Sequence, residues 1–151
     1  MKLFVVDASV AVKWFIPEEH SDVAELLLDE NFDLAVPRLF FSEFGNILWK
    51  KFSRDELSHE GVVDAARGLR SAMLTPVPDE WLLDAAIALA CELKHPVYDC
   101  MYLALADSLA PEADSFVTFA TFSMSLAICC VATDCSSEAT AIWRIISALS
   151  E

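Results

Sequence analysis

The chain has 151 residues, of which 56% are hydrophobic, and its 24 acidic against 10 basic residues give a formal net charge of −14 at pH 7. This length suits one domain with a real core, and only 3 Gly and 6 Pro argue against a disordered or loop-dominated protein. The negative charge argues against a simple nucleic-acid-binding module, but it is compatible with a cationic protein partner or with an enzyme that meets RNA through metal ions and a local basic patch.

Apolar runs and turn-forming residues predict strands that alternate with helices. Residues 2–6 form a short apolar run that is typical of a strand buried on both faces. Further strands are predicted at residues 32–36, 73–77, 116–119 and 128–132, and helices at 9–15, 18–29, 40–52, 58–70, 79–93, 98–109 and 138–149. This alternation predicts one α/β domain over residues 1–151, with a parallel sheet that helices cover on both faces.

The N-terminus and the cysteines favour a cytoplasmic protein. The apolar run after Met1 and Lys2 ends at Asp7, which is too short for a secretory signal. The 5 cysteines, an odd number, show no metal-ligand spacing and are interpreted as buried reduced thiols. Residues 115–133 carry no charge and have about the length of a membrane span, but they are rich in Ser, Thr and Cys, so a buried strand, helix and strand is the preferred interpretation and no membrane contact is expected.

Asp7 directly follows the first predicted strand. In an open parallel sheet, ligands bind beyond the carboxyl ends of the strands, where the strand order reverses, so Asp7 would project into that crevice. Ser9, at the start of the next helix, could cap backbone N–H groups or bind a metal-held water. Simple capping of the helix by Asp7 is the favoured alternative when this residue is considered alone.

Two further acids lie in apolar surroundings. Glu43 and Asn46 are three residues apart, so on a helix they share a face and can reach one ligand. A solvated helix edge is the alternative, although large apolar residues surround both. Asp99 lies in the first turn of a helix, where negative charge is favourable in itself. Because that helix is apolar on nearly every side, an ionised carboxylate at its start needs a partner or a metal.

Together these acidic segments resemble the three motifs of the PIN domain family, and most closely those of the VapC-type toxins of bacterial toxin–antitoxin pairs. The likeness in motif order and spacing extends from Met1 to about Ala110. The matching segments are Asp7-Ala8-Ser9, Glu43-Phe44-Gly45-Asn46 and Tyr98-Asp99-Cys100-Met101-Tyr102-Leu103-Ala104-Leu105-Ala106.

The resemblance implies a magnesium- or manganese-dependent endoribonuclease with a three-layer α/β/α fold around a four- or five-stranded parallel sheet. Asp7, Glu43 and Asp99 would be the catalytic metal ligands, with Ser9 and Asn46 in supporting positions. Carboxylates suit a hard cation that keeps several waters, and a deprotonated water would attack the RNA phosphodiester. The resemblance also implies a homodimer and a cognate antitoxin whose tail enters the active-site groove.

The fourth acid of the family is missing. It usually stands in a Thr-x-Asp setting, and this chain has Ala120 there; neither Asp114 nor Asp134 fits the motif. Binding of a second metal is therefore in doubt. Over residues 118–151 the likeness is weak, and two explanations are open: divergence, or an altered reading frame near residue 118.

Lys50 and Arg54 continue the helix face of Glu43 and Asn46 at helical spacing. The hypothesis is that they lead RNA phosphates toward the metal, and a plain solvated face is an equally good interpretation.

Two other function classes are alternatives to the ribonuclease. One is a PIN-like domain with an impaired site that acts only as a protein-binding partner. The other is a different magnesium-dependent α/β fold. Phosphatases of the haloacid type need a second Asp where Ser9 stands, and receiver domains need an acidic pair that this chain lacks.

Overall fold

The computed structural model describes residues 2–109, 117–118 and 128–131. The helix predicted at 138–149 and the position of Ala120 lie outside these residues.

The described strands form one sheet at the positions that the sequence predicts. They are β1 (Lys2–Val6), β2 (Phe32–Pro37), β3 (Leu74–Val77), β4 (Val117–Thr118) and β5 (Ile128–Val131), in the spatial order β3-β2-β1-β5-β4. β1 pairs in parallel with β2, with Lys2 opposite Phe32, and β2 pairs in parallel with β3, with Leu34 opposite Leu74. β3 is at the sheet edge, where the missing N–H of Pro76 is tolerated.

The expectation of a parallel sheet is wrong for β5. It runs antiparallel to β1, with Phe4 opposite Cys130, and it pairs antiparallel with β4 as well. A parallel crossover needs about a dozen residues or more, and only residues 119–127 separate β4 from β5. A connection this short is typical of two antiparallel strands, here β4 and β5.

The described helices lie near their predicted positions, but the first two are shorter. They are α1 (Ala8–Val12), α2 (Ser21–Glu25) with the 3₁₀ turn η1 (Leu26–Leu28), α3 (Leu39–Ser53), α4 (His59–Leu69), α5 (Asp79–Leu93) and α6 (Val97–Leu109). The helix predicted from residue 18 begins only at Ser21, because His20 has a left-handed backbone with φ 67° that no helix continues.

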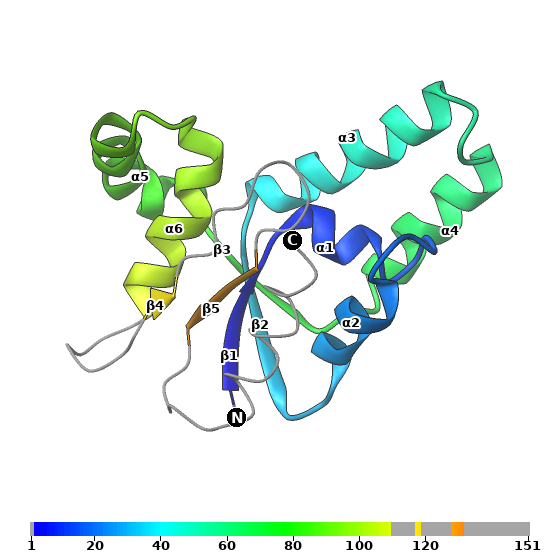
Figure 1. Cartoon of the computed structure of the whole chain (residues 1–151), viewed down its shortest axis with the longest axis horizontal. Helices are drawn as coiled ribbons and strands as arrows, with labels where there is room; N and C mark the ends of the chain where they lie inside the picture. The colour runs from blue at the N-terminus through cyan, green and yellow to red at the C-terminus, as the bar shows by residue number, and fades with distance from the viewer. Residues whose placement is uncertain (1, 110–116, 119–127, 132–151) are drawn as a thin grey trace.

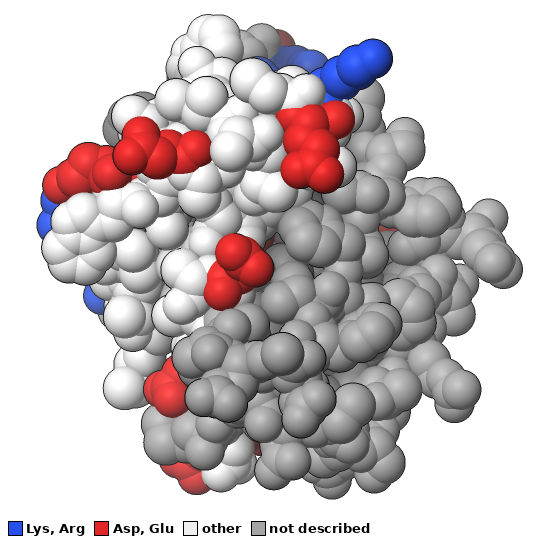
Figure 2. Space-filling model, turned by 90° about the vertical axis from the view of Figure 1, so that its left-hand side faces the viewer, with Lys and Arg blue, Asp and Glu red and all other residues white. Residues whose placement is uncertain are grey.

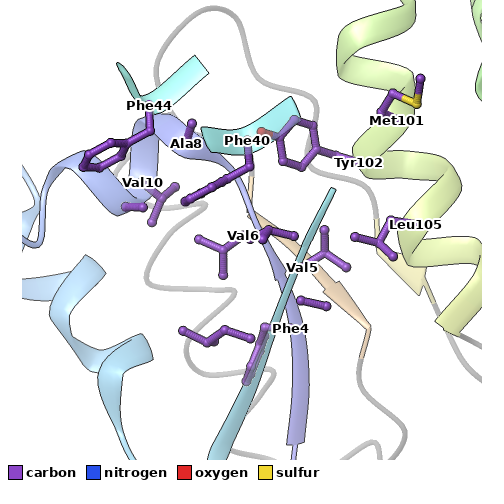
Figure 3. Packing of buried hydrophobic residues seen from close by; sticks show 14 of the residues in the cluster. Phe4, Val5, Val6, Ala8, Val10, Phe40, Phe44, Met101, Tyr102 and Leu105 are labelled. Carbon is purple, nitrogen blue, oxygen red and sulfur yellow. The ribbon is translucent and has the colours of Figure 1, made fainter. Parts of the chain in front are cut away.

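Helices cover both faces of the sheet, as predicted (Figure 1). α5 and α6 lie on one side of β1 and β2, and α1 to α4 lie on the other. α6 packs on β1 and β2, while α1 packs on α3. Phe4, Val5 and Val6 of β1 are all buried, as expected for a strand covered on both faces, and Figure 3 shows them between Val10 of α1 and Leu105 of α6.

None of the helices in the described ranges combines the length and the apolar character that crossing a membrane requires. Cys91 and Cys100 are free thiols. Cys100 is buried, as predicted, whereas the expectation of a buried thiol is wrong for Cys91, which is exposed.

Candidate functional site

The three predicted acids lie on or directly after elements that meet at one end of the sheet. Asp7 comes directly after β1, where the strand order reverses between β2 and β5. Glu43 lies in the second turn of α3, which begins two residues after β2 ends, and Asp99 lies in the first turn of α6. This is the place at which open α/β sheets bind ligands.

Asp7 caps α1, so the capping interpretation is correct for this residue. Its backbone is extended (φ −78°, ψ 150°), and its Oδ1 atom accepts hydrogen bonds from the Ser9 backbone N–H at 2.7 Å and from Ser9 Oγ at 2.5 Å. Burial raises the pKa of Asp7, the two bonds from Ser9 lower it, and the charge of Asp99 raises it further; the net shift is upward. Capping uses one carboxylate oxygen, and Oδ2 accepts no hydrogen bond from any described residue.

Glu43 is held by a residue of another helix. Tyr102 of α6 donates from its hydroxyl to Glu43 Oε2 at 2.5 Å. Burial raises the pKa of Glu43, the bond from Tyr102 lowers it, and the charges of Asp7, Asp99 and Asp79 raise it, so that the net shift is upward. Glu43 is half-buried, which agrees with the expectation that this part of α3 is not fully exposed to solvent.

Asp99, in the first turn of α6, has a partner in His95. His95 Nε2 lies 2.7 Å from Asp99 Oδ2. α6 is buried from Cys100 to Ala106, but the Asp99 side chain itself is 55% exposed. The acid therefore faces outward from a buried helix.

Each of the three acids is close enough to another for its charge to raise a neighbouring pKa. Asp99 raises that of Asp7, and both Asp7 and Asp99 raise that of Glu43. Over residues 2–109, 117–118 and 128–131, however, no three His, Cys, Asp or Glu side chains stand in positions that could hold one metal ion. The acids share one region, but their three carboxylates do not surround one common position.

Sequence reasoning missed three residues of this region. They are Tyr102, which binds Glu43; His95, which pairs with Asp99; and Asp79, whose Oδ1 accepts the Leu39 backbone N–H at the start of α3 (3.0 Å). Of the three, only His95 has a local signal, because it stands four residues before Asp99 in the sequence, just ahead of α6.

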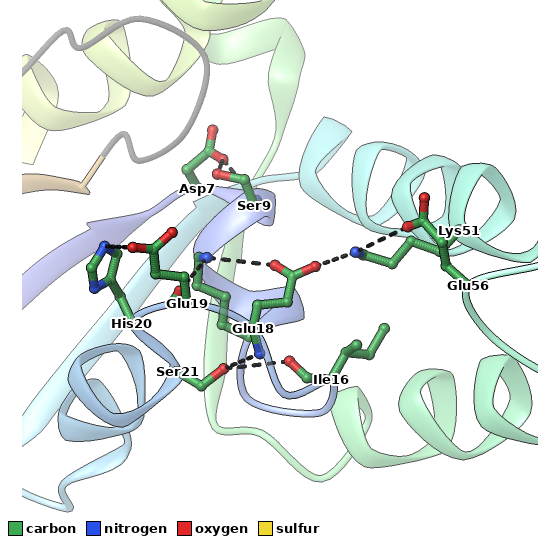
Figure 4. Close-up of polar contacts among 10 residues, drawn as sticks. Asp7, Ser9, Ile16, Glu18, Glu19, His20, Ser21, Lys51 and Glu56 are labelled. Carbon is green, nitrogen blue, oxygen red and sulfur yellow. Dashed lines mark hydrogen bonds and ion pairs between the residues drawn. The ribbon is translucent and has the colours of Figure 1, made fainter. Parts of the chain in front are cut away.

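The predicted supporting and RNA-binding residues of α3 lie further out. Asn46 and Lys50 are exposed, and Arg54 is the C-cap residue directly after the helix, with its Nη1 atom 4.0 Å from Glu56 Oε1. Lys51 points to a different partner, the carboxylate of Glu18 (Figure 4). Lys50 and Arg54 are thus accessible, and their role stays a prediction.

The family model of the PIN domain matches residues 4–119. The chain belongs to the PIN domain family. This PIN domain is also 32% identical over 111 residues to a protein named ribonuclease VapC3 from Pyrobaculum aerophilum, and the match covers 72% of this chain and 84% of that one. The family resemblance predicted from the three acidic motifs is confirmed.

The donor set of the PIN domain suits a hard divalent cation. Asp7, Glu43 and Asp99 are all carboxylates, which magnesium and manganese prefer over nitrogen or sulfur ligands. The upward pKa shifts of Asp7 and Glu43 mean that their charges are poorly compensated by the protein alone. A cation at this place would supply the missing compensation.

Proposed function

We propose that this protein is a magnesium- or manganese-dependent endoribonuclease, the toxin of a toxin–antitoxin pair, and that it acts in the cytoplasm. The observation that carries the proposal is that Asp7, Glu43 and Asp99 lie at one end of the sheet. They are close enough for the charge of one acid to raise the pKa of another. Membership of the PIN domain family and the similarity to a VapC ribonuclease support it.

In this proposal the three carboxylates hold the cation, and the residues around them fix their orientation. Ser9 holds one oxygen of Asp7, and Asn46 lies one turn after Glu43 on the same helix. The cation, when bound, supplies a nucleophilic hydroxide at neutral pH and neutralises charge on the phosphate. No side chain has to act as a covalent nucleophile.

The partners belong to the proposal as well. An RNA substrate would pass along Lys50 and Arg54, and a cognate antitoxin would block the same path. A homodimer is supported by exposed apolar side chains of α5, where Trp81 is 76%, Ile87 48% and Leu93 51% exposed.

The test is cleavage of an end-labelled RNA by the purified protein with Mg²⁺, Mn²⁺ or EDTA. We expect cleavage with either metal and none with EDTA. Asp7→Asn and Asp99→Asn should each lower the rate by at least about 100-fold, which corresponds to about 2.7 kcal/mol of transition-state stabilisation. Asp33→Asn, the same change at an exposed position of β2, is the matched control and should keep the full rate.

A second function is favoured by the Ala120 that stands in place of the fourth acid. A PIN-like domain with an impaired site would act only as a binding partner. It would bind no Mn²⁺ through Asp7, Glu43 and Asp99 and would leave RNA intact with either metal, and that result would overturn the ribonuclease proposal.

A further inference from the structure

We propose that Tyr102 is a positioning residue that holds the Glu43 carboxylate in place for the cation. This inference rests on the proposed function, because it concerns the same site. It adds a residue that lies in none of the three acidic positions and that the family resemblance does not assign to the metal.

The contact between Tyr102 and Glu43 joins two helices that are far apart in the sequence. The two residues are 59 positions apart, and the Oη–Oε2 distance of 2.5 Å is at the short end for a hydrogen bond to a carboxylate. Tyr102 is buried, with 5% of its surface exposed. Figure 3 shows its ring reaching from α6 toward Phe40 and Ala8, with the hydroxyl at the end near α1 and α3.

The same hydroxyl also meets the element that follows Asp7. The phenol donates to Glu43 of α3, and the backbone N–H of Ala8, at the start of α1, is close enough to lower the pKa of the Tyr102 hydroxyl against the larger effect of burial, which raises it. Tyr102 therefore links the three elements on which Asp7, Glu43 and Asp99 stand. Because its ring is fixed in the core, it can hold these elements in one arrangement.

The bond leaves part of Glu43 available for a ligand. Tyr102 uses Oε2, and within the described ranges no donor reaches Oε1. A carboxylate whose second oxygen is held by a fixed donor presents its other oxygen in one direction, which is how partners of metal ligands raise metal affinity in general. Loss of such a partner typically lowers affinity about 10- to 100-fold.

The 2 tyrosines of the chain, Tyr98 and Tyr102, both lie on α6 and provide a matched pair of variants. Tyr102→Phe removes the hydroxyl and keeps the buried ring. Tyr98→Phe removes a hydroxyl from the same helix, but the Tyr98 side chain is 65% exposed. A purely structural role of the Tyr102 hydroxyl would change the melting temperature in EDTA and leave the affinity for metal unchanged.

The experiment is a calorimetric titration of the full chain with Mn²⁺, below the melting temperature of every variant. We expect wild type and Tyr98→Phe to bind alike and Tyr102→Phe to bind about 10- to 100-fold more weakly. In a Glu43→Gln background the same Tyr102→Phe change should have less than a threefold effect, since the ligand that it positions is already lost.

The outcomes separate the two proposals. Equal Mn²⁺ affinity of wild type and Tyr102→Phe would overturn this inference and leave the metal site standing. An equally large loss in the Glu43→Gln background would also overturn it, because Tyr102 would then act through something other than Glu43. Absence of Mn²⁺ binding by wild type would overturn the proposed function itself.

Discussion

Each acid of the site has one oxygen engaged by a partner from the protein. Ser9 donates to Asp7, Tyr102 donates to Glu43, and His95 pairs with Asp99. These contacts fix the direction of each carboxylate without using both of its oxygens. Burial is the main reason that the pKa of Tyr102 is raised, with the Asp7 charge next, so its hydroxyl keeps its proton and stays a donor.

Asp7 should destabilise the metal-free protein at neutral pH. Its folded pKa is raised above the ordinary value of 3.8, so the folded state holds the proton more tightly than the unfolded state. The resulting stabilisation is complete below the ordinary pKa and is lost as the pH rises through the folded pKa. Above the folded pKa the buried carboxylate is charged, and this charge destabilises the folded state.

We therefore expect Asp7→Asn to raise the melting temperature in EDTA at pH 7. Asn keeps the cap of α1 and removes the charge, and each kcal/mol gained raises the melting temperature by about 2–4 °C for a chain of this size. The gain over wild type should shrink as the pH is lowered toward the ordinary Asp pKa. Thermal melts at several pH values check this, and an Asp7→Asn protein that melts below wild type at pH 7 would contradict it.

The acids could be predicted from the sequence, while most of their partners could not. Asp7, Glu43 and Asp99 stand out because ionised side chains in apolar surroundings need compensation. Tyr102 looks like one more core residue, since its role depends on where α3 lies relative to α6. That relation is set by packing across the sheet and has no local signal in the sequence.

At the level of elements, Glu18 ties α1 to α3. Its carboxylate pairs with Lys51 of α3 and with Lys13 at the end of α1, where the Lys13 Nζ–Oε2 distance is 3.5 Å (Figure 4). Burial alone would raise the pKa of Glu18, but the hydrogen bond and charge of Lys51, together with Lys13, lower it overall. These are the helices that follow Asp7 and carry Glu43.

We expect Glu18→Gln to lower the free energy of unfolding by about 1 kcal/mol at pH 7. Because the folded pKa of Glu18 is lowered, this stabilisation is present above the ordinary value of 4.5 and is lost as the pH falls through the folded pKa. Urea unfolding at pH 7 and at pH 3 measures it. Glu19→Gln is the control, since that side chain is 87% exposed, and equal effects of the two changes would argue against the bridge.

The positions of the strands could be predicted, whereas the direction of β5 could not. Apolar runs such as residues 2–6 and 128–132 indicate a strand in either direction. The short connection of residues 119–127 indicates that β4 and β5 are antiparallel to each other, but it does not indicate which of the two pairs with β1. α1 ends early because the backbone from Lys13 to Phe15 forms turns with bonds to the third residue before, and α2 starts late because of the left-handed backbone of His20. A periodic pattern alone shows neither.

For the whole molecule, charge decides how RNA could approach. Figure 2, which faces the side of α5 and α6, shows Asp and Glu in separate patches among the uncharged side chains of the described residues, with Lys and Arg at the upper edge. With a net charge of −14, such surface should repel a phosphate backbone, so contact has to come through a local basic face.

We expect the double variant Lys50→Ala and Arg54→Ala to bind RNA more weakly and with a flatter salt dependence. Two lost phosphate contacts reduce the slope of log K against log salt by about 1.4 for a single strand. Filter binding at several salt concentrations with Ca²⁺ in place of Mg²⁺ measures it. Arg67 on α4 and Arg70 directly after it are both exposed and form the control pair. An unchanged slope for the Lys50 and Arg54 variant would remove these two residues from the RNA path.

The central claim is that Asp7, Glu43 and Asp99 bind one cation together. Anomalous diffraction from crystals of the protein grown with Mn²⁺ tests it most directly. We predict a single peak about 2.1 Å from an oxygen of each of the three carboxylates. A peak that touches only one of them, or no peak at this end of the sheet at saturating Mn²⁺, would contradict the account.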